Sequence, residues 1–134
     1  MKNLMRSMLV FMLVFAVVPA FGAEVMQMWR CEVDDEATEE EVNDMAREWL
    51  EAAKKMPGGQ NLKAFVNLPV AVNAPGEIDI LFVVIAPSFE EWGTFWDSYL
   101  DAPPEGIDRV ENKYQDKIVC PGSALWEVKR VKLK

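Results

Sequence analysis

The amino-acid sequence predicts one α+β domain, in which a four-stranded antiparallel sheet carries two helices on one face. Three observations predict this class. Four segments rich in β-branched and aromatic residues are separated by two segments with helical spacing. Both helical segments begin with a helix-capping signature, and two cysteines lie at strand ends that this order of elements makes neighbours.

A leader precedes the domain, because residues 1–22 show the three parts of a secretory signal peptide. Lys2 and Arg6 give a positive start, an apolar run of about eleven residues follows, and Ala20-Phe21-Gly22 fits a cleavage site. The run is shorter than the ~20 residues that a membrane-spanning helix needs, and an uncleaved anchor is the alternative interpretation. We therefore expect an exported protein, periplasmic or secreted, whose mature domain is residues 23–134.

Composition excludes several functions. The chain has 14 basic and 22 acidic residues, a net charge of −8, and removal of the leader makes the charge more negative. Such a surface repels nucleic acid and anionic membranes, so neither is an expected partner. Histidine is absent, which excludes histidine-based nucleophilic triads and histidine-ligated metals. The acidic segment 34–41 lacks the glycine and ligand spacing of a calcium loop, and we predict no metal and no cofactor.

The first half of the mature chain predicts a strand followed by a helix. Residues 25–33, "VMQMWRCEV", are rich in strand-forming residues. Thr38 and Glu41 then form a capping-box pair, and Pro57-Gly58-Gly59 ends the helix. Its apolar residues recur at helical spacing: Val42, Met45, Ala46, Trp49 and Ala53.

The next segments predict a hairpin, and the C-terminus predicts a last strand. Residues 61–72 and 77–86 are predicted strands, joined by a turn at Asn73-Ala74-Pro75-Gly76. Residues 123–134 are the predicted final strand.

Between the hairpin and the last strand, a second helix is predicted from Phe89 to Leu100. Ser88 and Glu91 repeat the capping-box signature at its start. Residues 107–118 are ambiguous, and we expect a further helical turn or two there. Three apolar residues support that expectation: Ile107, Val110 and Tyr114.

The resulting order, β-α-β-β-α-β, is the ferredoxin-like arrangement, a sandwich with the sheet order 4-1-3-2. Cys31 lies near the end of the first strand and Cys120 just before the fourth, and these strands are antiparallel neighbours in that topology. We predict a disulfide between them, which would add roughly 4–5 kcal/mol of stability through its long loop. Two buried free thiols are the alternative.

Both faces of the predicted sheet are apolar. In the third strand, one face carries Ile78, Ile80, Phe82 and Val84, and the other carries Leu81, Val83 and Ile85. An antiparallel sheet with helices on one face normally exposes polar residues on the other. Because large exposed apolar patches mark interfaces, we expect a second copy of the chain to cover the open face.

At this level the chain resembles the dimeric α/β-barrel proteins, which are ferredoxin-like domains that pair sheet against sheet. The resemblance covers residues 24–134 and rests on topology and on the doubly apolar sheet, with no catalytic motif. It implies a pocket between the sheet and the helices. Members include cofactor-independent monooxygenases, isomerising enzymes and proteins without established chemistry. The haem-degrading members use a histidine that this chain lacks.

The second helix carries the candidate ligand-binding residues. Helical spacing of i, i+3, i+4 and i+7 places four rings on one face: Trp92, Phe95, Trp96 and Tyr99. They either fill the core or line a cavity for a flat apolar ligand. Trp29 is a candidate in the same layer, and Asn67 is a candidate polar group.

Two functions stay open from the sequence. The first is a non-catalytic exported homodimer that binds a small apolar or aromatic ligand or a protein partner. The second is a cofactor-independent small-molecule enzyme, monooxygenase-like or isomerase-like. No acid–base pair stands out at a spacing that catalysis requires, which favours the first, and no catalytic residue is assigned.

Overall fold

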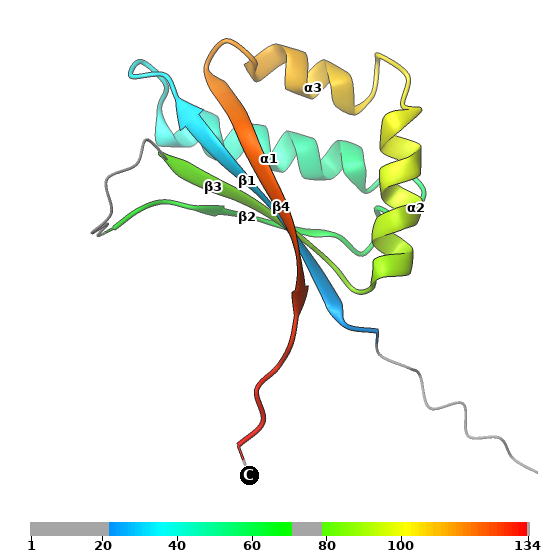
Figure 1. The fold of residues 1–134 in the computed structure, drawn as a ribbon. Helices are drawn as coiled ribbons and strands as arrows, with labels where there is room; N and C mark the ends of the chain where they lie inside the picture. Colours follow the sequence, from blue (N-terminus) through cyan, green and yellow to red (C-terminus); the bar gives the residue numbers. More distant parts are fainter. Residues whose placement is uncertain (1–21, 71–78, 134) are drawn as a thin grey trace, which may run out of the picture.

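A computed structural model of the chain describes residues 22–70 and 79–133. The predicted signal peptide up to residue 21 and the predicted turn at Asn73–Gly76 lie outside the described residues. Figure 1 shows the elements in chain order. They are β1 (Glu24–Val33), α1 (Glu39–Ala53), β2 (Lys63–Asn67), β3 (Ile80–Ala86), α2 (Phe89–Leu100), α3 (Ile107–Tyr114) and β4 (Ile118–Val128).

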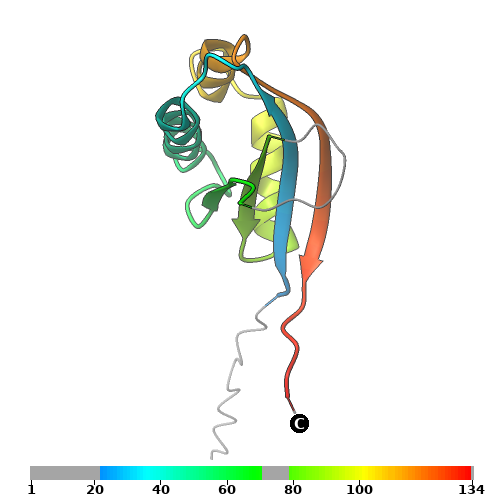
Figure 2. The same ribbon diagram turned by 90° about the vertical axis from the view of Figure 1, so that its left-hand side faces the viewer.

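The sheet topology matches the prediction. The strand order is β2-β3-β1-β4, which is 4-1-3-2 read from the other edge, and every neighbouring pair is antiparallel. The helices lie on one side of the sheet (Figures 1 and 2). The predicted arrangement had two helices, and the segment that was ambiguous in sequence forms the third, α3, with Ile107, Val110 and Tyr114 buried.

The helix starts follow from their capping residues. The Thr38 hydroxyl accepts a hydrogen bond from the Glu41 amide at 3.2 Å, and the Thr38 amide donates to the Glu41 carboxylate at 3.0 Å, which completes the predicted capping box. At α2 only half of the box forms. The Ser88 hydroxyl accepts from the Glu91 amide at 3.1 Å, but the Glu91 carboxylate accepts from the Asn61 amide group instead.

The strands after α1 differ in length from the prediction. Strand β2 ends at Asn67, and Pro69 follows, which has no N–H for the ladder. Strand β4 spans 118–128 rather than 123–134. Its start was predicted too late because Pro121-Gly122 is typical of a break between strands. In the structure these residues lie within the strand, at a bulge where the register with β1 shifts by one residue between Arg30 and Glu32. A proline is tolerated at a bulge in an edge strand.

The hydrophobic core lies between the sheet and the helices. It takes alternate residues from the two central strands, among them Val25 and Cys31 from β1 and Phe82 and Val84 from β3, and the apolar stripes of all three helices. All five predicted apolar positions of α1 are buried. The side chains on the opposite face of the sheet therefore point away from this core.

That opposite face is apolar along its middle. One row of paired residues crosses all four strands: Phe65, Val83, Met28 and Ala124. Met26, Ile85 and Trp126 continue the apolar surface beside it, while Arg30 and Asn67 lie in the next row. Phe65 is 46% exposed and Trp126 is 53% exposed. This set of residues is called the open face below.

Candidate functional site

A cavity of about 350 Å³ opens between the sheet and the helices. Six of the seven elements line it, all except β2. Its lining residues are Trp29, Met45, Trp49, Phe82, Tyr99, Glu111, Tyr114, Gln115, Ile118, Val119 and Cys120. The volume lies in the range of small-molecule sites, and the lining is mostly aromatic and aliphatic with few polar groups, as in such sites.

Three aromatic rings form one wall of the cavity. Trp29 from β1 and Phe82 from β3 are cross-strand partners with ring centroids 5.5 Å apart. Trp49 from α1 packs edge-on against both, at 5.9 Å from Trp29 and 5.3 Å from Phe82. Rings held on three different elements against a buried core keep their positions, so this wall is preformed.

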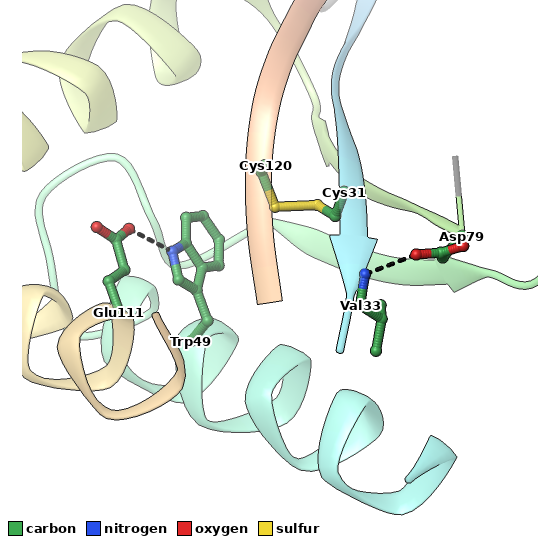
Figure 3. Close-up of a disulfide and its surroundings, with 6 residues drawn as sticks. All are labelled: Cys31, Val33, Trp49, Asp79, Glu111 and Cys120. Carbon is green, nitrogen blue, oxygen red and sulfur yellow. Dashed lines mark hydrogen bonds between the residues drawn. A yellow bond between two sulfur atoms is a disulfide. The ribbon is translucent and has the colours of Figure 1, made fainter. Parts of the chain in front are cut away.

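A single carboxylate, that of Glu111 on α3, provides the ionised group of the cavity. The Trp49 indole N–H donates to its Oε1 at 3.1 Å, as Figure 3 shows. The Tyr99 hydroxyl donates to the same carboxylate, with distances of 2.9 Å to Oε1 and 3.1 Å to Oε2. These two donors come from α1 and α2, so the carboxylate is oriented by two neighbouring helices.

Tyr99 remains a hydrogen-bond donor over the whole physiological pH range. Burial raises the pKa of its hydroxyl above the usual value, and the negative charge of Glu111 raises it further. A neutral hydroxyl beside a carboxylate can only donate to it. The Tyr99–Glu111 contact is therefore a fixed element of the site.

Helix α3 is tied to α1, which fixes the position of Glu111. The Lys113 ammonium donates to Glu48 at 2.7 Å, and the Tyr114 hydroxyl donates to the same oxygen at 3.0 Å. These hydrogen bonds, with that of Lys113 the stronger cause, lower the pKa of the Glu48 carboxyl. Beyond the helix, Lys117 pairs with Glu41. The Lys113–Glu48 pair that joins the two helices is thus ionised at neutral pH.

The predicted disulfide is present and borders the cavity. Cys31 and Cys120 are bonded, which joins β1 to β4 (Figure 3). Cys31 is fully buried, whereas Cys120 is exposed and belongs to the cavity lining. The bridge lies at the bulge, so it fixes the irregular part of the edge strand that forms one side of the cavity.

The structure brings together only part of the predicted ligand-binding set. Trp29 and Tyr99 line the cavity. Trp92 and Phe95 are buried in the adjoining core, Trp96 is half-buried there, and none of these three lines the cavity. Trp92, Trp96 and Tyr99 stack in series, and Phe95 packs at a tilt against Trp92 and Tyr99. Asn67 is exposed, and it lies on the open face with Phe65, on the far side of the sheet.

Glu111 was not identified from the sequence, although a signal existed. Ile107, Val110 and Tyr114 define the buried stripe of α3, and position 111 falls on the same stripe, four residues after Ile107. A glutamate on an apolar helical stripe needs a hydrogen-bond partner. The partners, Trp49 and Tyr99, become visible only in the folded chain.

Comparison with solved structures confirms the fold class. A variant of SnoaB, a cofactor-independent oxygenase from Streptomyces nogalater, superposes with a TM-score of 0.53 and 9% identity, over 82% of this chain and 97% of SnoaB. The Arabidopsis thaliana protein At3g17210 gives 0.52 and 8%, over 84% and 98%. A dimeric ferredoxin-like protein of unknown function from Thermobifida fusca gives 0.46 and 13%, over 80% and 92%.

These similarities confirm, at the level of topology alone, the resemblance to the dimeric α/β-barrel proteins. No protein-family model matches the chain, and no curated protein matches it in sequence. Within the described residues, no helix is both long and apolar enough to cross a membrane.

Proposed function

We propose that this chain is an exported, homodimeric ferredoxin-like domain that holds a small apolar or aromatic molecule between its sheet and its helices. The observation that carries the proposal is the aromatic cavity of about 350 Å³ with one oriented carboxylate. Export is supported by the signal-like leader and by the disulfide, since disulfides persist in oxidising compartments.

The cavity has the features that separate a binding site from a packing defect. A defect in a core is small and wholly apolar, because a void costs dispersion contacts. This cavity instead combines preformed rings with Glu111, and its lining includes exposed residues, among them Gln115 at the end of α3 and Val119 in β4. A flat ligand could stack on the rings and direct one polar group at the carboxylate.

A neutral fluorescent probe tests whether the cavity binds. We expect N-phenyl-1-naphthylamine to bind the protein with an increase in emission, because its rings leave water for the aromatic wall. Gln115→Trp places an indole at an exposed position of the lining and should weaken binding about tenfold or more. Asn112→Trp, at an exposed position of α3 outside the lining, should leave binding unchanged. Equal binding by all three proteins would place the probe elsewhere and contradict the proposal.

The homodimer is inferred from the open face. Its middle row is apolar on all four strands, and its two aromatic residues, Phe65 and Trp126, are about half exposed. Two such faces packed together would remove these rings from water, which stabilises association by roughly 25 cal/mol for each Å² of apolar surface. A polar protein partner would gain less from this surface.

Met28→Lys is expected to separate the dimer. Met28 lies in the middle row of the open face, and two copies of an unpaired ammonium buried there would raise the dissociation constant about 100-fold. The fold should survive because a monomer leaves this position open to water. Sedimentation of this variant beside Glu40→Lys, an exposed charge change on α1, gives the comparison. A wild-type monomer, or a dimer that tolerates Met28→Lys, would contradict the sheet-to-sheet pairing.

A cofactor-independent enzyme of isomerase or monooxygenase type is the second candidate, and Glu111 favours it. This carboxylate, hydrogen-bonded to a protonated tyrosine, could remove a proton from an acidic C–H or phenolic O–H of a bound substrate and return it elsewhere in an isomerisation. Chromatography coupled to mass spectrometry of a ligand recovered after incubation separates the candidates. An isomer keeps its mass but changes its retention time, an oxygenated product gains mass, and a ligand unchanged in both means binding alone.

A further inference from the structure

We propose that the preferred occupant of the cavity is an organic cation, a protonated or quaternary amine on an aromatic or apolar body, with Glu111 as its counter-ion. The inference rests on the proposed binding function and names the ligand class. It follows from the charge balance of the cavity, from the direction of its hydrogen bonds and from the chemistry of its walls.

The cavity lining carries a net negative charge that no positively charged lining residue balances. Among the lining residues Glu111 is the ionised one, and none is a lysine or arginine. In the described part of the chain, no lysine or arginine nitrogen lies within 4.0 Å of the Glu111 carboxylate. The nearby Lys113 is paired with Glu48 at 2.7 Å. A half-buried carboxylate without a cation favours a ligand that brings one.

The hydrogen bonds to Glu111 leave that charge in place. Trp49 and Tyr99 are neutral donors, so they orient the carboxylate without neutralising it. These two donors leave part of the carboxylate's accepting capacity for a ligand. Asp108, one turn earlier on α3, adds a second negative charge near Tyr99 and contributes to the raised pKa of that hydroxyl.

The walls also select for positive charge. Trp29, Trp49 and Phe82 form the aromatic wall, and Tyr99 and Tyr114 complete the set of rings around the cavity. The faces of such rings carry negative potential and attract cations, with tryptophan the strongest. The chain as a whole carries a net charge of −8, which raises the local concentration of cations and repels anions.

A matched pair of ligands tests the inference on the purified, oxidised protein. Benzylamine is protonated at pH 7, and benzyl alcohol is its neutral counterpart of nearly equal size. We expect benzylamine to displace bound N-phenyl-1-naphthylamine at a concentration about tenfold lower than benzyl alcohol does. Added salt should reduce that preference, because screening weakens the contribution of charge.

Two variants assign the preference to its residues. Glu111→Gln keeps an acceptor for Trp49 and Tyr99 but removes the charge, so the tenfold preference should disappear. Tyr99→Phe removes a donor and keeps the carboxylate, so the preference should persist. Since Glu111→Gln could perturb folding, the salt dependence of the wild-type protein is the independent measurement.

The outcomes separate this inference from the function on which it rests. If the probe binds but benzylamine is not preferred, or if the preference survives Glu111→Gln, the proposed preference for a cation is wrong and the proposed binding function of the cavity stands. Failure of the probe to bind at all overturns both.

Discussion

Gly58→Ala is expected to reduce the free energy of unfolding by about 3 kcal/mol or more. Gly58 has φ of +76°, a conformation that costs a residue with a Cβ about 1–2 kcal/mol. An added Cβ would also lie 2.4 Å from the Phe95 amide nitrogen and 2.6 Å from the Glu91 carbonyl oxygen. Both atoms belong to the backbone of α2, so the helix itself would have to move, at a further cost of roughly 1–3 kcal/mol.

Gly93→Ala is the matched control for that variant. Gly93 lies inside α2, and a Cβ built there meets no atom within 4 Å apart from its chain neighbours and the backbone of its own helix. Alanine should therefore stabilise the protein by about 0.5–1 kcal/mol, because glycine is unfavourable in a helix. Urea unfolding measures both variants, and equal effects would mean that the turn after α1 does not pack against α2 as described.

Removal of the disulfide is the second large expected effect. The bridge joins residues 89 apart, and a loop of that length contributes roughly 4–5 kcal/mol in the chain-entropy model. We expect the double variant Cys31→Ala, Cys120→Ala to lose most of this contribution to the free energy of unfolding, as measured by urea denaturation. A reducing agent should destabilise the wild-type protein comparably and leave the double variant unchanged.

Two free thiols in the untreated, unfolded protein would contradict the bridge. A single variant, Cys120→Ala, leaves Cys31 as a buried thiol and separates loss of the bond from loss of both side chains. If its stability matches that of the double variant, the bond itself accounts for the effect.

Local patterns predicted the helices and the topology well, because capping and periodicity act within a few residues. Helix α2 was predicted with its observed bounds, from Phe89 to Leu100. The start of β4 was wrong by five residues, because Pro121 is acceptable only at a bulge on an edge strand, and that position depends on pairing with β1. Strand pairing is a property of the whole sheet.

The candidate site was less accessible to sequence reasoning. Alternation along β2 predicts that Asn67 lies on the opposite face of the sheet from Ala64 and Val66. The local sequence does not indicate which of these two faces the helices cover. Trp49 and Glu111 are 62 residues apart, so their hydrogen bond is visible only after folding. The rings of α2 illustrate the same limit, since Tyr99 reaches the cavity while Trp92 and Phe95 fill the core.

Because six elements assemble the cavity, it exists only in the folded chain. A molecule that occupies it therefore acts on the native state alone, and mass action converts occupancy into thermal stability. An occupant present at 100 times its dissociation constant adds about 2.7 kcal/mol to the free energy of unfolding. The melting temperature thus reports any molecule that occupies the cavity, and a collection of metabolites of any chemical class can be screened by thermal unfolding.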